Sequence, residues 1–227
     1  ELDLQENLLS TFKLIESIKK SGDLSKKIIF SSSAAPLAGN NTMPINENLP
    51  YKPLSPYGAS KASSESYLQA YANAFSLKTL ILRFSNIYGP GSILKGSVVA
   101  NMIKSCIDNS EINIYGDGLQ TRDFVYIDDL IDIIIFGIEK HTFIDSSPIH
   151  VCSGIPTSIK SLAHMIKEEM SEVGYHNVNI RYLNPLKGDA RENYSSNKKL
   201  TDSGFPAVKK LSQVRIKTTI KFFLNNL

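Results

Sequence analysis

Residues 27–33 of this chain read KIIFSSS, a short β-prone run that opens directly into small polar residues. Residues 79–84 read TLILRF, a nearly continuous apolar run typical of a parallel strand that is covered on both faces. Between them, residues 36–56 are rich in Pro and Asn and predict a long surface loop, whereas the Ala-, Ser-, Glu- and Gln-rich residues 57–75 predict a helix. Strand, loop, helix and strand in this order predict a βαβ unit.

The same alternation continues on both sides of this unit. Apolar residues at helical spacing predict a helix over 8–18, and the Ser21-Gly22-Asp23 segment supplies its end. Further helices are expected over 98–107, 128–139 and 159–170, a strand over 149–151 and a turn over 116–118. Alternating strands and helices predict an α/β fold with a mostly parallel sheet.

The composition describes a chain that can bury a core, since 42% of the 227 residues are hydrophobic. The net charge is +3, from 25 basic and 22 acidic residues, and we find no Lys/Arg block of the kind that follows a phosphate backbone. This argues against a nucleic-acid partner. The longest apolar run, residues 131–138, contains Asp132 and is too short to cross a bilayer, so no membrane partner is expected.

The cysteines and histidines narrow the class of protein further. Cys106 and Cys152 lie far apart without a Cys-x-x-Cys spacing, which argues against a disulfide framework and favours a reducing compartment, with the cytoplasm as the expected location. The four histidines have no metal-ligand spacing, so no metal site is expected. The chain begins with Glu1 and carries no signal pattern, and we interpret it as part of a longer protein.

A tyrosine and a lysine four residues apart begin the helix predicted over 57–75. Residues 55–61 read SPYGASK, so Tyr57 and Lys61 share one helix face and can present their polar ends to the same pocket. A phenol has a pKa of about 10 and becomes a useful base near neutral pH only where a cation favours the phenolate. The hydroxyl of Ser33, at the end of the first strand, can then donate to a substrate oxygen. The pattern predicts a proton-transfer site for oxidising an alcohol or reducing a ketone.

The same Tyr-x-x-x-Lys spacing occurs a second time, at Tyr194 and Lys198. No apolar strand and no serine cluster precede this copy, and it lies in a polar stretch over 191–197. Spacing alone is therefore weak evidence for a site. We expect the second copy to be a solvated pair and the functional pair to be Tyr57 and Lys61.

Four motifs in a fixed order carry a family resemblance. They are FSSSA at 30–34, SPYGASK at 55–61, LRFSNIYGP at 82–90 and GDGLQTRDFVYIDD at 116–129, with Lys187-Gly188-Asp189 following near the end. Together they resemble the extended short-chain dehydrogenase/reductase family, specifically its NAD-dependent epimerase/dehydratase branch that acts on nucleotide sugars. The match spans essentially the whole chain. It implies a Rossmann-type, doubly wound, mostly parallel sheet with a smaller C-terminal α/β lobe that binds the substrate.

The resemblance also implies roles for the residues of the first three motifs. Tyr57 matches the catalytic base for a sugar hydroxyl, and Lys61 matches the lysine that supports this base and holds the nicotinamide ribose. Ser33 matches the catalytic Ser/Thr. The cofactor-binding positions implied in this way are Ser31, Ser32, Tyr57, Lys61, Phe84 and Ile87, for NAD or alternatively NADP.

A second set of positions matches contacts to a nucleotide sugar: Ser33, Asn86, Ser97, Val98, Asn113, Tyr115, Arg122 and Asp189. Asn86 and Arg122 match contacts to the diphosphate, where a planar, bidentate guanidinium suits phosphate oxygens. The alternative for Arg83 and Arg122 is a surface or ion-paired position. Tyr115 matches a position beside the base, and we expect it to lie partly in the core because isoleucines flank it. Asn193 matches a position that limits the C2 substituent of the sugar, and its small side chain is expected to admit an N-acetyl group.

Three departures from the family pattern shape the expected function. Dehydratases of this branch place Asp-Glu directly after the catalytic Ser/Thr, whereas this chain has Ala34 and Ala35, which favours epimerisation. Leu186 and Lys187 stand where many relatives have an Arg before the Gly-Asp pair, so one phosphate contact is expected to be weaker or moved. The sequence contains no G-x-x-G-x-x-G turn, so on the order of 90 further residues are expected to precede Glu1.

The resemblance predicts a division of the chain into two domains. Residues 1–90 are expected to be the C-terminal half of a Rossmann-type NAD(P)-binding domain that carries the Ser, Tyr and Lys. Residues 91–227 are expected to form mainly a nucleotide-sugar-binding lobe, with a segment at about 123–155 that returns to the sheet domain. Helices 8–18 and 57–75 match those through which relatives dimerise as a four-helix bundle, so a homodimer is expected by analogy.

The expected function is a nucleotide-sugar 4-epimerase that acts on a UDP-hexose or UDP-N-acetylhexosamine in polysaccharide biosynthesis. It would work by transient oxidation at C4 with tightly bound NAD. An NAD(P)H-dependent 4-keto nucleotide-sugar reductase or dehydratase is one alternative. A non-catalytic, truncated nucleotide-sugar-binding remnant is the other, from a different class of protein.

Overall fold

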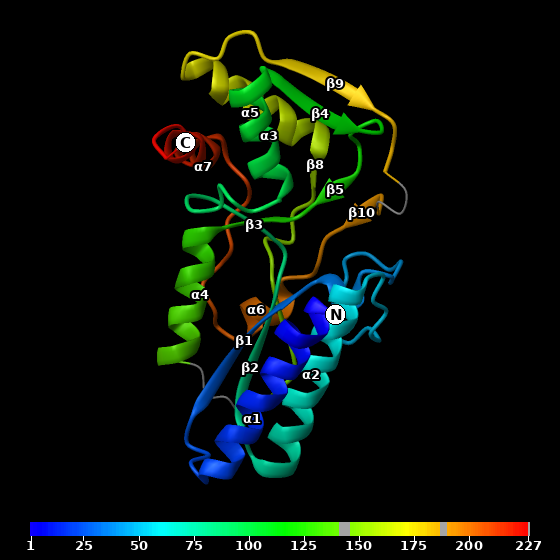
Figure 1. Cartoon of the computed structure of the whole chain (residues 1–227), viewed down its shortest axis with the longest axis vertical. Coiled ribbons are helices and arrows are strands. Elements are labelled where there is room, and N and C mark those ends of the chain that lie inside the picture. The colour runs from blue at the N-terminus through cyan, green and yellow to red at the C-terminus, as the bar shows by residue number, and fades with distance from the viewer. Residues whose placement is uncertain (141–145, 187–189, 227) are drawn as a thin grey trace. The chain divides into compact units, whose positions relative to one another are not determined.

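The computed structural model describes residues 1–140, 146–186 and 190–226 (Figure 1). The chain forms two compact units: unit 1 comprises Glu1–Ser85, Ile131–Val151 and Ser195–Ala207, and unit 2 comprises Asn86–Leu130, Cys152–Tyr194 and Val208–Leu227. The chain therefore leaves unit 1 and returns to it twice. These units are groups of residues in contact, and the expected assignment of cofactor and substrate binding to 1–90 and 91–227 stays a prediction.

Unit 1 is built on a parallel sheet. Its elements are a π-helical turn η1 (Leu4–Leu9), α1 (Ser10–Ser21), β1 (Lys27–Ser33), a 3-10 turn η2 (Ala35–Leu37), α2 (Pro56–Phe75), β2 (Lys78–Phe84), most of α4 (Ile127–Glu139), β7 (Ile149–Val151) and α6 (Lys198–Asp202). The strand order is β1-β2-β7, with both pairs parallel and with Ser33 of β1 opposite Phe84 of β2. The βαβ unit predicted from the sequence is confirmed.

Helices cover both faces of this sheet. Helices α1 and α2 lie side by side over one face (Figure 1), where Ile15, Ile28, Leu68, Leu77 and Ile81 form a buried cluster. On the other face, Gly137 of α4 lies against Ile29 and Leu80; a Cβ at this glycine would come within 2.7 Å of the Leu80 side chain. Alternate residues of β1 and β2 thus face opposite helical layers, as expected of a doubly wound sheet.

The described residues of unit 2 form three small sheets and three longer helices. Its elements are β3 (Asn86–Tyr88), α3 (Val98–Asn109), β4 (Glu111–Tyr115), β5 (Thr121–Arg122), β6 (Phe124–Tyr126), β8 (Thr157–Ser158), α5 (Ile159–Glu172), β9 (Asn179–Leu183), β10 (Glu192–Asn193) and α7 (Gln213–Leu224). Strand β3 pairs with β6 and β4 with β9, both parallel, and the third sheet has the order β10-β5-β8. Helices α3, α5 and α7 contact one another around a shared apolar core.

The strands and helices expected from the sequence all occur, and the Rossmann-type α/β fold class is confirmed. Within the described ranges, two kinds of feature are absent: a helix that could span a membrane and a cluster of metal-ligating side chains. No helix there is both long and apolar enough to span a membrane. The same residues contain no group of three or more His, Cys, Asp and Glu side chains arranged to hold a metal ion.

Candidate active site

The carboxyl end of β1 presents three consecutive serines. The hydroxyl of Ser33 accepts a hydrogen bond from Ala35 N at 3.2 Å, which turns the chain sharply out of the strand. The main chain of Ala34 then donates to Phe84 O at 3.1 Å, so the strand end stays attached to β2. Ser31 is exposed, whereas Ser32 is only 3% exposed. Hydrogen bonds thus hold the strand end to β2 and to the turn that follows it.

Helix α2 begins directly beside this turn. Ser55 caps it, because its Oγ accepts from Gly58 N at 3.1 Å, and Pro56 occupies the first turn, where a missing N–H costs nothing. A Cβ at Gly58 would lie 2.8 Å from Ala35 O, so glycine is needed for the close approach of the helix start to the strand end. This contact places Tyr57, the neighbour of Gly58, next to the serine turn.

Lys61 connects the helix to the strand end. Its Nζ donates to Ser31 O at 3.0 Å, lies 4.9 Å from the centre of the Phe30 ring and lies 5.9 Å from the centre of the Tyr57 ring. Burial lowers the pKa of the Lys61 ammonium, and the negative charge of Glu65 opposes this shift. Tyr57 itself is 39% exposed. A partly desolvated cation thus lies near an accessible phenol.

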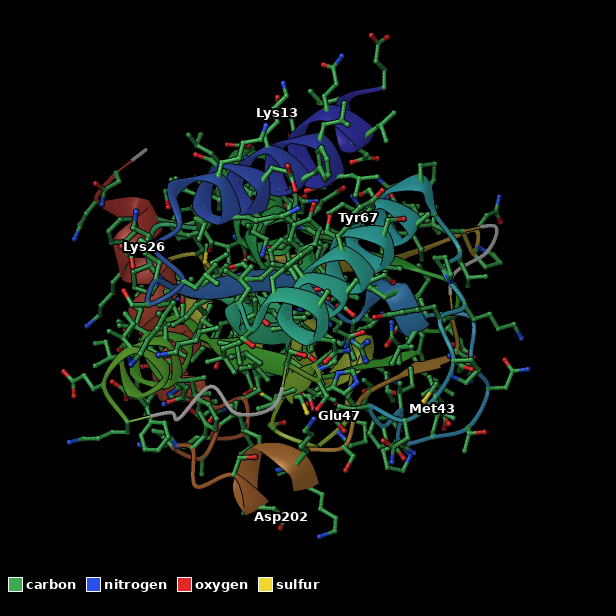
Figure 2. The ribbon with its side chains drawn as sticks, turned by 90° about the horizontal axis from the view of Figure 1, so that it is seen from below. Lys13, Lys26, Met43, Glu47, Tyr67 and Asp202 are labelled. Atoms are coloured by element: carbon green, nitrogen blue, oxygen red, sulfur yellow. The ribbon has the colours of Figure 1, made fainter. Side chains whose placement is uncertain are left out.

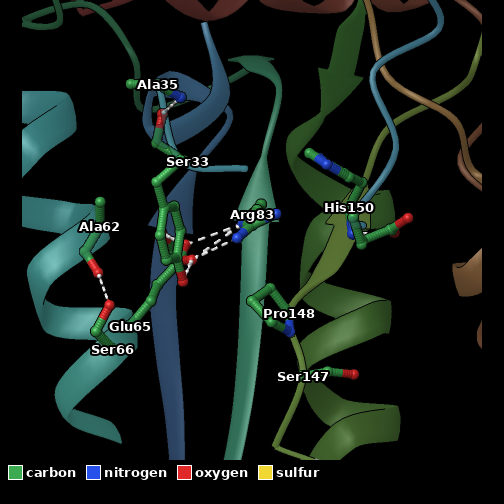
Figure 3. A network of polar contacts seen from close by, with 12 residues as sticks. Ser33, Ala35, Ala62, Glu65, Ser66, Arg83, Ser147, Pro148 and His150 are labelled. Atoms are coloured by element: carbon green, nitrogen blue, oxygen red, sulfur yellow. Dashed lines mark hydrogen bonds and ion pairs between the residues drawn. The ribbon is translucent and has the colours of Figure 1, made fainter. Parts of the chain in front are cut away.

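A buried polar network lies beneath this pair (Figure 3). Glu65 of α2 is fully buried and receives Arg83 Nη2 at 2.7 Å and Arg83 Nε at 3.1 Å. The hydroxyls of Ser32 and Tyr51 donate to the same carboxylate, the second at 2.9 Å. Burial, followed by the charge of Glu65, raises the pKa of Tyr51 to about 12. The ion-paired alternative for Arg83 is confirmed.

His150 of β7 lies next to Arg83 in the strand register and is fully buried. Burial, together with the positive charges of Arg83 and Lys199, lowers its pKa to about 3. The imidazole is therefore neutral at physiological pH. Among the described residues, neither ring nitrogen has a hydrogen-bond partner.

Apart from Ser33 of unit 1 and Asp189, the predicted substrate residues lie in unit 2. Both the main-chain N and the side-chain Nδ2 of Asn86 donate to Asp123 O, at 3.1 and 3.0 Å. Arg122 Nη1 donates to the main-chain oxygens of Thr121 and Ala190, at 2.7 and 2.8 Å. Asn193 of β10 is the register partner of Arg122, so these two residues are neighbours on adjacent strands.

The remaining substrate positions divide between a helix start and a strand. Ser97 caps α3 by accepting from Ala100 N at 3.4 Å, and Val98 is the first residue of that helix. The main-chain N–H groups of such a helix start suit an anion. Asn113 and Tyr115 alternate along β4 with buried isoleucines, and Tyr115 is 42% exposed. The expectation that Tyr115 lies partly in the core is wrong, because strand alternation turns it away from its flanking isoleucines.

The predicted residues are thus distributed over both units. Unit 1 contains Ser31, Ser32, Ser33, Tyr57, Lys61 and Phe84, of which the first five come together around the end of β1. Unit 2 contains Ile87, Asn86, Ser97, Val98, Asn113, Tyr115 and Arg122. Asp189 lies outside the described residues. The second Tyr-x-x-x-Lys copy is not on one helix face, since Tyr194 precedes α6 and Lys198 is its first residue. Lys198 pairs with Asp202 at 2.6 Å on the surface.

Glu65 and Tyr51 belong to the buried polar network without a role predicted from the sequence. A signal for Glu65 exists, because it follows Lys61 by four residues and so shares the face of Tyr57 and Lys61. Its partner Arg83 stands in an otherwise apolar strand, where a charge requires a partner of opposite sign. Nothing local points to Tyr51, which lies in the long loop.

Comparisons with known proteins identify the family. The family model described as NAD dependent epimerase/dehydratase family matches residues 1–152. A putative UDP-glucose 4-epimerase of Methanocaldococcus jannaschii is 32% identical over 222 residues, which cover 97% of this chain and 70% of that protein.

Two solved structures are similar over nearly the whole chain. The UDP-N-acetylglucosamine 4-epimerase from Methanobrevibacter ruminantium, in complex with UDP-N-acetylmuramic acid, has a TM-score of 0.87 and 28% identity and covers 98% of this chain. The UDP-glucose 4-epimerase of Thermotoga maritima, with UDP-glucose, has a TM-score of 0.84 and 32% identity and covers 97%. This chain spans 70% of the length of each of these two structures.

Proposed function

Because the chain belongs to the NAD dependent epimerase/dehydratase family, we propose that it is the catalytic and sugar-nucleotide-binding part of a UDP-sugar 4-epimerase that works with NAD. The observation that carries the proposal is the position of Lys61, half-buried between the end of β1 and the start of α2, with its ammonium 3.0 Å from Ser31 O and behind the exposed Tyr57. The similarity to two UDP-sugar 4-epimerases supports the substrate class.

The residues at the end of β1 fit the nicotinamide end of NAD. An ammonium has three donors, of which Lys61 uses one on Ser31 O, so it can also donate to ribose hydroxyls. The small side chains from Ser31 to Ala35 leave room for a flat ring beside the strand end, and Phe84 ends the neighbouring strand β2. Tyr57, Lys61 and Phe84 would hold this end of the cofactor. When bound, NAD supplies a reversible hydride acceptor for the sugar C4 carbon.

Tyr57 is the proposed acid and base. With the Lys61 ammonium nearby, the Tyr57 oxygen takes the proton of the C4 hydroxyl as the C4 carbonyl forms. The Ser33 hydroxyl donates to the same C4 oxygen and orients it. After the keto sugar has turned its other face to the site, Tyr57 returns the proton to the C4 oxygen, and the C4 epimer results. Protons and hydride are thus conserved over the cycle.

Unit 2 is proposed to hold the UDP group. Arg122 can pair with diphosphate oxygens in a planar, bidentate geometry, and the N–H groups at the start of α3, near Ser97 and Val98, favour the same negative charge. Tyr115 offers an exposed ring on which a base can stack, with Asn113 two residues away on the same face of β4. Asp189 is the proposed acceptor for the nucleotide ribose. Asn193, beside Arg122, is proposed to leave room for an N-acetyl group at C2.

Epimerisation is favoured over the dehydratase alternative by the residues that follow Ser33. Ala34 and Ala35 carry no acid or base, and elimination of water needs one. Reduction of a 4-keto sugar would use the same Ser, Tyr and Lys, and a stoichiometric consumption of NADH or NADPH distinguishes it. Cys106 and Cys152 lie far apart in sequence without a Cys-x-x-Cys spacing, which favours a reducing compartment. We therefore place the enzyme in the cytoplasm, where it would supply sugar nucleotides for polysaccharide biosynthesis.

A homodimer through α1 and α2 is part of the proposal. Phe12 and Tyr67 are 37% and 43% exposed, and their rings contact each other at 5.6 Å across the two helices. Tyr67 points outward from α2 on the side where Lys13 leaves α1 (Figure 2). Two such helix pairs would bury these rings as a four-helix bundle. Sedimentation of the protein should give twice the monomer mass, and Tyr67→Glu should give the monomer, whereas Lys26→Glu, outside α1 and α2, should leave the dimer intact.

The enzymatic test follows the C4 configuration directly. The purified protein is incubated with NAD and either UDP-glucose or UDP-N-acetylglucosamine, and the products are separated from their C4 epimers by chromatography. Formation of the epimer without net NADH supports the proposal. Net reduction or oxidation of the cofactor would identify a reductase, and the binding of UDP-sugar without any product would identify a non-catalytic binding protein.

A further inference from the structure

One face of α2 carries three ionisable side chains that are spaced one helical turn apart. Tyr57, Lys61 and Glu65 follow one another at intervals of four residues, which places them on the same side of the helix. Tyr57 is 39% exposed, Lys61 is half-buried and Glu65 is fully buried. This face therefore runs from the surface, where the proposed chemistry takes place, into the core of unit 1.

The Glu65 carboxylate joins α2 to three other segments. Arg83 of β2 donates to it through Nη2 at 2.7 Å and through Nε at 3.1 Å (Figure 3). Tyr51, from the loop before α2, donates at 2.9 Å, and Ser32 of β1 donates to the other carboxylate oxygen. All three donors are side chains, so the network depends on residue identity and not on the fold alone.

The bond from Ser32 is the one that reaches the active site. Ser32 lies between Ser31, whose carbonyl accepts from Lys61, and Ser33, the proposed catalytic serine. Two bonds therefore join α2 to the last residues of β1, one from Lys61 and one to Glu65. Because these bonds leave the helix one turn apart, a slip of the helix along the strand breaks at least one of them.

Stability alone does not explain a buried ion pair at this place. Removing two charges from water costs free energy that their attraction often fails to recover, and packed apolar side chains commonly stabilise a core as well or better. What a buried carboxylate with several fixed donors does provide is one preferred geometry. That geometry is worth most where reacting groups must be held within a fraction of an ångström.

We propose that Glu65 is a positioning residue of the active site: held by Arg83 in the core, it binds Ser32 and so fixes the register between α2 and the end of β1. Tyr57 and Lys61 are thereby presented to Ser33. The effect on turnover rests on the proposed function, whereas the effect on the environment of Lys61 does not.

The test compares two hydroxyl deletions on the same carboxylate. Ser32→Ala removes the donor on the strand that carries Ser31 and Ser33, and Tyr51→Phe removes the donor in the loop. The reporter is Lys61: its rate of acylation by an amine reagent is followed against pH by mass spectrometry of the peptide that contains it. Lys61 lies near the carbonyl of Ser31 and the ring of Tyr57 and interacts with the charge of Glu65, and neither substitution replaces any of these three residues.

Ser32→Ala should let water reach Lys61, so that the midpoint of its acylation profile shifts towards that of an exposed lysine. Tyr51→Phe should leave the midpoint where it is in the unaltered chain. Ser32→Thr, which keeps the hydroxyl, should restore the profile. An unchanged midpoint in Ser32→Ala, or an equal shift in both variants, would overturn the positioning role. Circular dichroism establishes that each variant is folded.

The same variants are then assayed with UDP-sugar and NAD. Ser32→Ala should lower kcat by roughly 10- to 100-fold, since misplacement of a reacting group by about an ångström has an effect of this size. The KM for the UDP-sugar should stay nearly unchanged, because the proposed UDP contacts of unit 2 are intact. Tyr51→Phe should keep its full kcat, and equal losses in both variants would contradict the proposal. A protein without any turnover contradicts the proposed function, and the acylation profile, which needs no substrate, then decides the role of Glu65.

Discussion

The two Tyr-x-x-x-Lys segments of this chain have the same spacing and opposite surroundings. In the first, Tyr57 and Lys61 share a face of α2, and the ammonium of Lys61 lies against Ser31 O with its pKa lowered by burial. In the second, Tyr194 precedes α6, and Lys198 is exposed and paired with Asp202. The two segments therefore differ in their surroundings and not in their spacing, and the strand end with the buried network beneath it sets the first segment apart.

The largest effect is expected from removing the two phenols one at a time. Tyr57→Phe should lower turnover by about 10²- to 10⁴-fold, the usual contribution of a positioned acid or base, and leave the binding of UDP intact. Tyr194→Phe removes the same hydroxyl from the second segment and should leave turnover unchanged. Rates are measured as formation of the C4 epimer. Comparable losses in both variants would remove the distinction between the segments.

The second largest effect is expected from the ion pairs that accompany the two Tyr-x-x-x-Lys segments, because one pair is buried and the other is exposed. Glu65→Gln leaves the guanidinium of Arg83 buried without a counter-charge, which is expected to lower the free energy of unfolding by about 3–5 kcal/mol. Asp202→Asn breaks the exposed pair with Lys198, for which little or no change is expected because water and salt screen it. Urea denaturation of the two variants measures both values. A small loss of unfolding free energy in Glu65→Gln would mean that water reaches the network more readily than its burial indicates.

His150, which is buried next to Arg83 in unit 1, makes the stability of the protein depend on pH. The pKa of His150 is lowered to about 3, whereas an unfolded histidine titrates near 6.5. Between these values the unfolded chain binds a proton that the folded chain does not. The contribution of His150 to the free energy of unfolding is therefore fully present above a pH of about 6.5 and is lost as the pH falls towards about 3. The loss attributable to His150 is up to roughly 1.4 kcal/mol per pH unit.

Substitution isolates this contribution from that of other groups. The buried Asp123, whose pKa is raised by burial, contributes in the opposite direction at acid pH, so the difference between variants is more informative than one curve. His150→Gln should flatten the dependence of the unfolding free energy on pH between about 6 and 4. His176→Gln, which replaces a histidine on an exposed turn, is the matched control. An unchanged slope in His150→Gln would show that the imidazole is protonated in the folded state.

The sequence predicts elements well where a local pattern determines them. The apolar run over 79–84 and the capped helix at 57–75 are both found, because burial on two faces and a Ser-Pro start leave little choice. It does not predict β4 or β9, since each is stabilised by pairing with the other across a long stretch of chain. Helix α7 was missed as well: its β-branched residues give a weak helical signal, and the packing of Ile216, Ile220 and Phe223 stabilises it instead.

The same distinction applies to the candidate site. Tyr57, Lys61 and Ser33 follow from short motifs, whereas the bonds from Ser32 and Arg83 to Glu65 join residues that are far apart in sequence. A pattern of residues indicates which groups can react. Which groups hold them in place follows only from the packing of strand against helix.

The smallest effect is expected at the start of α2. There, a loss of protein stability can be distinguished from a change in the position of Tyr57. Ser55→Ala removes the cap on Gly58 N and should lower the free energy of unfolding by about 1 kcal/mol. Ser158→Ala removes the matching cap on Ser161 N at the start of α5 and should have a similar effect on stability. Only the first of these helices carries Tyr57, two residues after its cap, so fraying of that turn should lower kcat severalfold in Ser55→Ala and not in Ser158→Ala. Equal stability losses with equal kcat would mean that the contact between Gly58 and Ala35 holds Tyr57 in place without the cap, and the strand end would then be the sole feature that distinguishes this tyrosine from Tyr194.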